Sequence, residues 1–219
     1  MFKFYFKYIN IPHYEDLVSE MQPHILKLVN DNNLSGFHHI NMDDFFKKCP
    51  KVNEYFTSKN IKLECIAIII AEPNTNLGIH KDWQDDNNAL ALNMEIINCR
   101  KNYTAMFFCE NEKEAMKILT TPKGSKFWRI FDTSKCYLIS EFNLTNPVLF
   151  DTLKIHQVRN TTNERRISIS FRFKNKDAEI FDILLEALFW RSTTAAAAPP
   201  CCSPATTWET SRPSASGCC

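Results

Sequence analysis

Between residues 61 and 174 the chain alternates short β-rich runs with turn residues. Eight runs follow one another: KLECIAIIIAE, NLGIHKD, ALALNMEII, TAMFFCE, KCYLISE, NPVLFDT, HQVRN and RRISISFRF. β-Branched and aromatic residues fit the pleated surface of a sheet, and short strands at regular spacing are typical of sandwiches and barrels rather than βαβ units. We therefore predict a mainly β protein with flanking helices (α+β) whose core, residues 61–174, is a double-sheet jelly roll.

Helical patterns lie on both sides of this core. Before it, apolar residues recur with helical spacing at Leu17, Met21 and Ile25, and Pro23 predicts a kink or break. After it, KDAEIFDILLEALFW places Ile180 and Leu184 on one apolar stripe. We predict helical support of the core from residues 1–60 and a closing helix over residues 175–190.

The composition changes abruptly at about residue 191. From there to residue 219 the chain consists mainly of Ala, Pro, Ser, Thr and Cys, whereas the preceding sequence is rich in Lys, Asn, Ile and Phe. Such a segment buries too little apolar area to offset the entropy cost of ordering. We predict a disordered low-complexity tail over 191–219, and its origin as native or read-through sequence stays open.

The overall charge and hydropathy exclude some classes of protein. The formal net charge is +1, so the chain lacks the broad basic field of most nucleic-acid-binding proteins. It also lacks a signal-peptide pattern and an apolar run long enough to span a membrane. These features predict a soluble cytoplasmic protein with a small-molecule or peptide partner, no membrane contact and no nucleic acid.

The cysteines form no CxxC pair. In a cytoplasmic chain, scattered thiols are more often small buried apolar residues than parts of a disulfide framework or a zinc site. We therefore interpret Cys99 and Cys109 as packing residues.

Alternation within two of the predicted strands indicates a polar interior. In ALALNMEII, Asn93 and Glu95 share the face opposite Leu92 and Met94, because successive side chains of a strand point to opposite faces. RRISISFRF repeats the pattern, with Arg and Ser on one face and Ile and Phe on the other. If helices cover the apolar faces, the polar faces point into the barrel, where they can form a site.

Three residues carry a metal-binding pattern. His80 and Asp82, in NLGIHKDWQDD, are two apart on one strand and therefore face the same way. His156 is the only histidine after His80 and lies at a predicted strand end. Two imidazoles and one carboxylate form the facial triad that holds non-haem Fe(II) with open coordination positions. An Asp-rich turn that caps itself would explain His80 and Asp82 without a metal.

Arg166 and Ser168 supply a candidate anion site. Arg166 opens the last strand ten residues after His156, and Ser168 lies on the same face. A guanidinium holds a carboxylate bidentately, and a nearby hydroxyl adds a further donor. Arg165 is the nearest rival, but it shares its face with Ile167 and should lie on the apolar side. A surface position with Arg166 paired to Glu164 remains the alternative.

This order of residues, HxD, a distant His and then RxS, resembles the Fe(II)/2-oxoglutarate-dependent dioxygenases across residues 61–174. The resemblance extends to small microbial and viral members through the stretches ALNMEIINC and PVLFDTLKIHQVRNTTNERRISISFRF. It implies a double-stranded β-helix, cupin-like fold. It also implies Fe(II) bound by His80, Asp82 and His156, which would be the catalytic residues.

The same resemblance implies that Arg166 and Ser168 bind the distal carboxylate of 2-oxoglutarate and that Asn93 helps to hold this cosubstrate. In such enzymes O₂ and 2-oxoglutarate are consumed as a C–H bond of the substrate is oxidised, usually by hydroxylation. The implied substrate is a small molecule, an amino acid or a peptide side chain. The sequence defines neither the substrate nor the choice between hydroxylation and demethylation, nor the oligomeric state.

Two other functions stay open. Arg166 and Arg172 are six apart on one face, a spacing that resembles the AlkB-like nucleic-acid dealkylating enzymes, although the near-zero net charge does not favour nucleic acid. A non-catalytic, cupin-type ligand-binding jelly roll is the other alternative, and a buried Arg166 argues against it.

Several other polar residues have simpler explanations. His38, His39, Asp43 and Asp44 suggest a second metal site but are better explained by a solvated loop before a helix. Trp83 and Asp85 either line the substrate entrance or lie in an exposed turn.

Overall fold

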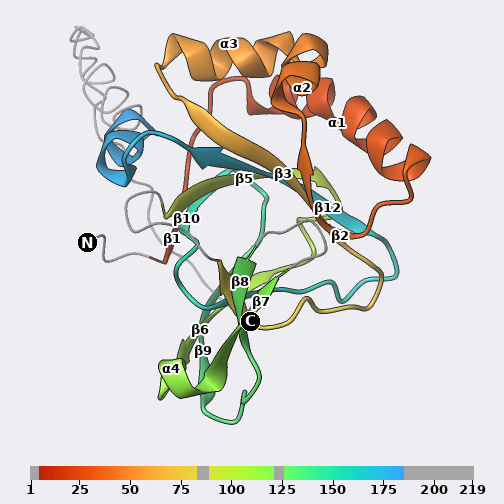
Figure 1. Cartoon of the computed structure of the whole chain (residues 1–219). Coiled ribbons are helices and arrows are strands. Elements are labelled where there is room, and N and C mark those ends of the chain that lie inside the picture. The colour runs from red at the N-terminus through yellow and green to blue at the C-terminus, as the bar shows by residue number, and fades with distance from the viewer. Residues whose placement is uncertain (1–4, 83–88, 121–125, 185–219) are drawn as a thin grey trace, which may run out of the picture.

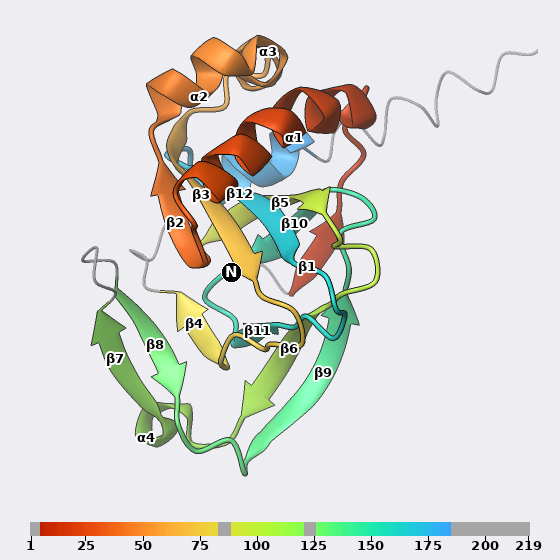
Figure 2. The same cartoon turned by 90° about the vertical axis from the view of Figure 1, so that its right-hand side faces the viewer.

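Two antiparallel β-sheets of six strands each face one another (Figures 1 and 2). The computed structural model describes residues 5–82, 89–120 and 126–184. In strand order the major sheet contains β1 (Phe6–Tyr8), β10 (Val148–Asp151), β5 (Leu90–Ile97), β12 (Arg166–Phe173), β3 (Leu63–Ala71) and β2 (Gly36–Ile40). The minor sheet contains β7 (Met116–Thr120), β8 (Lys126–Ile130), β4 (His80–Asp82), β11 (His156–Val158), β6 (Thr104–Cys109) and β9 (Cys136–Phe142). This architecture confirms the predicted mainly β, double-stranded β-helix (jelly-roll) fold.

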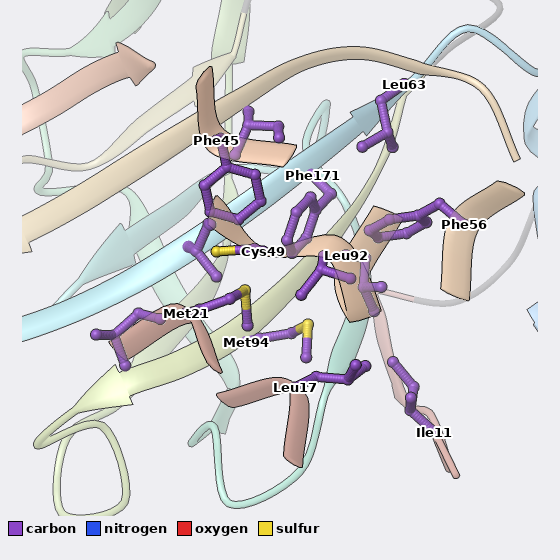
Figure 3. Packing of buried hydrophobic residues seen from close by; sticks show 14 of the residues in the cluster. Ile11, Leu17, Met21, Phe45, Cys49, Phe56, Leu63, Leu92, Met94 and Phe171 are labelled. Atoms are coloured by element: carbon purple, nitrogen blue, oxygen red, sulfur yellow. The ribbon is translucent and has the colours of Figure 1, made fainter. Parts of the chain in front are cut away.

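Three helices cover the outer face of the major sheet (Figure 2). They are α1 (Tyr14–Asp31), α2 (Met42–Lys48) and α3 (Pro50–Ser58), and a short α4 (Glu112–Ala115) lies at the far end of the minor sheet. Between the helices and the sheet lies the largest apolar cluster, in which Phe45 and Phe56 pack against Phe171 of β12 (Figure 3). Burial of this cluster fixes which face of the major sheet points away from the helices.

Helix α1 continues through Pro23, so the predicted break is wrong. Its buried residues Leu17, Met21, Ile25 and Val29 recur every four positions, and Pro23 lies on the exposed side. A proline removes one backbone hydrogen bond of the helix. Because Pro23 lies outside the apolar stripe, the packing of that stripe on the sheet is intact and stabilises the helix despite the lost hydrogen bond.

Alternation along β12 separates the core from the interior of the barrel. Ile167, Ile169 and Phe171 belong to the cluster under the helices. The opposite face carries the polar residues of the same strand, and all of them are buried: Arg166, Ser168, Ser170 and Arg172. Strand β12 therefore contributes polar groups to the space between the two sheets, as the sequence pattern indicated.

Four strands lay outside the predicted runs: β1, β2, β7 and β8. Strand β2 contains His38 and His39, which we interpreted as a solvated loop, and its hydrogen bonds to β3 correct that interpretation. Strands β1 and β2 are the edges of the major sheet, β7 is an edge of the minor sheet, and β8 is the neighbour of β7. Edge strands are often charged and only partly buried, so their apolar alternation is weak in the sequence.

The predicted ends of the chain are only partly described. Residues 177–184 are helical, within the predicted closing helix of 175–190. The rest of that helix, the tail over 191–219, and Trp83 and Asp85 lie outside the described residues. Within the described part of the chain, no helix is both long enough and apolar enough to cross a membrane.

Candidate metal centre and its anion pocket

Adjacent strands of the minor sheet bring His80, Asp82 and His156 together. His80 and Asp82 are the two ends of β4, and His156 of β11 pairs directly with His80. Directly opposed residues of an antiparallel pair share a face, so both imidazoles point into the barrel with the carboxylate. The three side chains can offer one ligand atom each, and these atoms all lie within 4.8 Å of one another. Among the described residues, no other group of three or more His, Cys, Asp or Glu side chains meets this geometry. His38, His39, Asp43 and Asp44 therefore do not form a second metal site of this kind.

Backbone carbonyls orient both imidazoles. Nδ1 of His80 lies 2.7 Å from the carbonyl oxygen of Gly78, and Nδ1 of His156 lies 2.8 Å from that of Lys154. A carbonyl oxygen only accepts, so each Nδ1 carries the proton and donates it. Each Nε2 is then left with a free lone pair, which is the arrangement that histidine ligands of metals adopt.

The charges of the triad also fit a cation. Burial alone would raise the pKa of Asp82, but the Arg172 guanidinium and the two imidazoles outweigh it and hold that pKa at about 2. Burial, followed by the proximity of His80, lowers the pKa of His156 to about 4. At neutral pH the carboxylate is therefore ionised and the His156 imidazole is neutral, as metal coordination requires.

Arg172 forms an ion pair with Asp82 from across the barrel. Its Nη2 donates to Oδ2 of the carboxylate, and its side chain is only 6% exposed. The sequence singled out Arg172 for its spacing from Arg166, but the spacing gave no indication of this contact. The other oxygen, Oδ1, faces Nε2 of His80 at 3.6 Å. The guanidinium thus fixes which carboxylate oxygen points toward the two imidazoles.

Arg166 is a buried cation with unused donors. It is 1% exposed, and its Nη2 donates to Oγ1 of Thr104 over 3.4 Å. Its Nε and Nη1 have no partner among the described residues. An unpaired buried cation is costly, so a guanidinium in this state is suited to an anion. The alternative of a surface Arg166 paired with Glu164 does not agree with this burial.

The remaining polar residues line the same inner face. Ser168, two residues after Arg166, is also 1% exposed. Asn93 of β5 lies directly opposite Ser170 of β12, and within the described residues its Oδ1 and the Ser170 Oγ have no hydrogen-bond partner. Arg165 points elsewhere, where its Nε donates to Glu72 at 3.1 Å. Arg165 and Arg166 therefore point to opposite sides of the chain, and only Arg166 points into the barrel.

Two aromatic rings that the sequence did not single out frame the triad. The ring of Phe150 meets His156 edge-on at 5.3 Å between centroids, and the ring of Phe127 meets His80 in the same way at 6.1 Å. Phe127 reaches the triad because β8 pairs with β4 in the minor sheet, whereas Phe150 reaches it from β10 of the facing major sheet. No local sequence signal identifies them.

The interpretation of Cys109 as a packing residue is wrong. Cys109 of β6 and Cys136 of β9 form a disulfide between directly opposed residues of neighbouring strands. Their sequence separation of 27 carries no motif, and only the register of the two strands brings them together. Cys99 is a free, buried cysteine.

Comparison with known proteins finds only distant structural similarity. No protein-family model matches the chain, and no curated protein is similar to it. Among solved structures, the carbocyclase SnoK from nogalamycin biosynthesis, described as non-haem and alpha-ketoglutarate-dependent, has a TM-score of 0.49 and 10% identity over 79% of each chain. A Pseudomonas putida prolyl-4-hydroxylase has a TM-score of 0.42 and 12% identity over 77% of this chain and 90% of its own.

A third solved structure is the viral collagen prolyl hydroxylase of Paramecium Bursaria Chlorella virus-1, in its 2-oxoglutarate complex. It has a TM-score of 0.41 and 12% identity over 78% of this chain and 96% of its own. At these levels of similarity, the activity has to be argued from the residues of this chain.

Proposed function

We propose that this chain is an Fe(II)- and 2-oxoglutarate-dependent dioxygenase that hydroxylates a small molecule, an amino acid or a peptide side chain. The observation that carries the proposal is the pairing of a His-Asp-His cluster with a buried, unsatisfied Arg166 inside one barrel. Neither feature alone specifies the chemistry. Together they offer a divalent metal ion three ligands and offer an organic dianion a cation to bind.

The donor set fits ferrous iron. Two imidazoles and one carboxylate on one side of a metal leave open positions for other ligands. Bound Fe(II) supplies the oxidation of a substrate C–H bond by O₂, coupled to conversion of 2-oxoglutarate into succinate and carbon dioxide. His80, Asp82 and His156 would hold the metal, with both Nδ1 protons fixed by backbone carbonyls.

Arg166 would bind the distal carboxylate of 2-oxoglutarate through Nε and Nη1, the two donors without partners. Ser168 lies on the same face two residues along β12 and would add a hydroxyl donor. Asn93 lies opposite Ser170, which stands between Ser168 and Arg172 along β12, and would help to orient the cosubstrate. Arg172 holds Asp82 in place and keeps it ionised, which excludes protonation of a ligand oxygen at neutral pH.

The ion pair of Arg172 with Asp82 also bears on the AlkB-like alternative. The arginine spacing that suggested this alternative is accounted for by positioning of a metal ligand. A non-catalytic ligand-binding barrel would leave the donors of Arg166 without a function unless its ligand were an anion. We therefore favour the oxygenase.

Purified protein incubated with Fe(II), ascorbate and 2-oxoglutarate tests the proposal. Succinate should form slowly even without the substrate, and His156→Ala should abolish it. The absence of both 2-oxoglutarate binding and succinate formation, despite stoichiometric iron, would contradict the proposal.

A further inference from the structure

Strand β8 places two side chains beside the metal centre that the proposed reaction does not use. In the register of β4 and β8, Arg129 lies directly opposite His80 and Phe127 lies directly opposite Asp82. Opposed residues share a face, so both side chains belong to the face that carries the triad. The edge-on contact between the Phe127 and His80 rings agrees with this placement.

Arg129 packs onto a glycine of the ligand-bearing segment. A Cβ atom built on Gly78 would lie 1.6 Å from the Cζ atom of Arg129, so any side chain at position 78 would displace the guanidinium from its present place. The carbonyl oxygen of the same Gly78 accepts the Nδ1 proton of His80. Gly78 therefore both orients a triad imidazole and seats a cation next to it.

The guanidinium of Arg129 has no carboxylate partner in the described part of the chain. Six arginines lie in that part, and four of them pair with carboxylates: Arg100 with Glu95, Arg159 with Glu141, Arg165 with Glu72, and Arg172 with Asp82. The two others are Arg166 and the half-buried Arg129. A half-buried cation beside a metal centre and without a protein counter-ion is a site for an external anion.

Arg129 and Arg166 lie on opposite sides of the triad. Arg166 reaches Thr104 on β6, whereas Arg129 is on β8, and β4 and β11 lie between these two strands. One diacid bound to the metal and to Arg166 would therefore leave Arg129 available. Near Arg129 the same face of the hairpin carries Phe127 opposite Leu119 and a second cation, Lys117, directly opposite Arg129. The Lys117 ammonium lies over the ring of Phe131, which is 56% exposed.

We propose that Arg129, seated on Gly78 and flanked by Phe127, is the subsite for an anionic group of the primary substrate. The group would be a carboxylate or a phosphate attached to an apolar portion, held so that a neighbouring C–H bond faces the metal. This inference rests on the proposed function, because it needs the triad to hold a metal and Arg166 to hold the cosubstrate.

Paramagnetic relaxation tests this subsite without knowledge of the substrate. Protein loaded with Mn(II) and saturated with 2-oxoglutarate is titrated with inorganic phosphate, observed by ³¹P NMR, and in a second series with ¹³C-labelled acetate. Relaxation by the nearby Mn(II) should reveal a saturable site for at least one of the two anions, and the better probe indicates phosphate or carboxylate.

Arg129→Gln should weaken this binding by about tenfold or more, since hydrogen bonds to charged groups are worth about 1.5–3 kcal/mol. Gly78→Ala, which keeps Arg129 but displaces it, should weaken it similarly, and Arg129→Lys should retain part of it. Arg165→Gln, at an arginine engaged by Glu72, is the matched control and should bind the anion as the wild type does.

The outcomes separate this inference from the proposed function. If 2-oxoglutarate fails to bind the Mn(II)-loaded wild type, the proposed function itself fails. If 2-oxoglutarate binds but neither anion shows a saturable effect that depends on Arg129, the subsite is overturned. Loss of 2-oxoglutarate binding in Arg129→Gln would also overturn it, because Arg129 would then belong to the cosubstrate site.

Discussion

At the scale of single residues, the candidate site contains one charged pair, Asp82 with Arg172, and one buried cation, Arg166, without a carboxylate partner among the described residues. Asp82 and Arg172 neutralise each other inside the barrel, while Arg166 keeps two donors unused. The histidines are held by carbonyls two residues before them, at Gly78 and Lys154. The protein alone therefore leaves room for a divalent cation at the triad and for an anion at Arg166.

Removal of one imidazole should abolish tight metal binding. Changes to residues that merely orient metal ligands commonly cost about 10–100-fold in affinity, so loss of a ligand in His80→Ala should cost at least about 100-fold. Isothermal titration with Mn(II) measures this difference. His13→Ala, at an exposed histidine outside the barrel, is the control, and equal losses in both variants would contradict the assignment of His80 as a ligand.

Arg172→Gln should destabilise the metal-free protein. It leaves the Asp82 carboxylate largely buried without its cation, and breaking such a pair typically costs about 3–5 kcal/mol. Arg172→Lys, which keeps the charge, should lose less. Because a divalent cation also compensates Asp82, Mn(II) should restore more stability to Arg172→Gln than to the wild type. Urea unfolding with and without Mn(II) checks both statements; an unchanged midpoint in the metal-free variant would show that the ion pair does not contribute.

At the scale of helices and strands, the sequence predicted the orientation of side chains in strands that bury one face completely. The alternation in β5 and β12 predicted which residues line the barrel, because the opposite face packs under helices. The spacing of His80 and Asp82 was readable for the same reason, since a strand repeats every two residues. Partly exposed edge strands such as β2 and β7 lack this constraint and were missed.

Contacts that depend on register could not be read from the sequence. Cys109 bonds to Cys136, His80 lies opposite Arg129, and Asp82 pairs with Arg172 only because particular strands pair or face one another. A slip of one residue would turn these side chains to the other face. Residue type and spacing along the chain do not specify which strands pair or in which register.

The disulfide between β6 and β9 should stabilise the minor sheet. A cross-link of this loop length is typically worth about 2–4 kcal/mol. The double variant Cys109→Ser/Cys136→Ser should therefore melt at a lower temperature than the oxidised wild type. Reductant should lower the melting temperature of the wild type to that of the variant and leave the variant unchanged. A wild type that is insensitive to reductant would show that the bond contributes nothing to stability.

At the scale of the whole molecule, the two sheets have different tasks. The major sheet is anchored by the helices on its outer face and contributes the arginines of β12 (Figure 1). The minor sheet contributes the three candidate metal ligands from β4 and β11. The proposed site exists only where the two sheets face each other, so its function depends on the closed barrel rather than on either sheet.

The most direct test of this arrangement is isothermal titration of 2-oxoglutarate into Mn(II)-loaded and metal-free protein, for the wild type, Arg166→Met and the control Arg165→Met. We predict one equivalent bound with Mn(II) by the wild type and the control, binding much weaker without the metal, and little or none by Arg166→Met. Binding that is equally strong without the metal, or unchanged in Arg166→Met, would contradict the claim that triad and guanidinium together form one cosubstrate site.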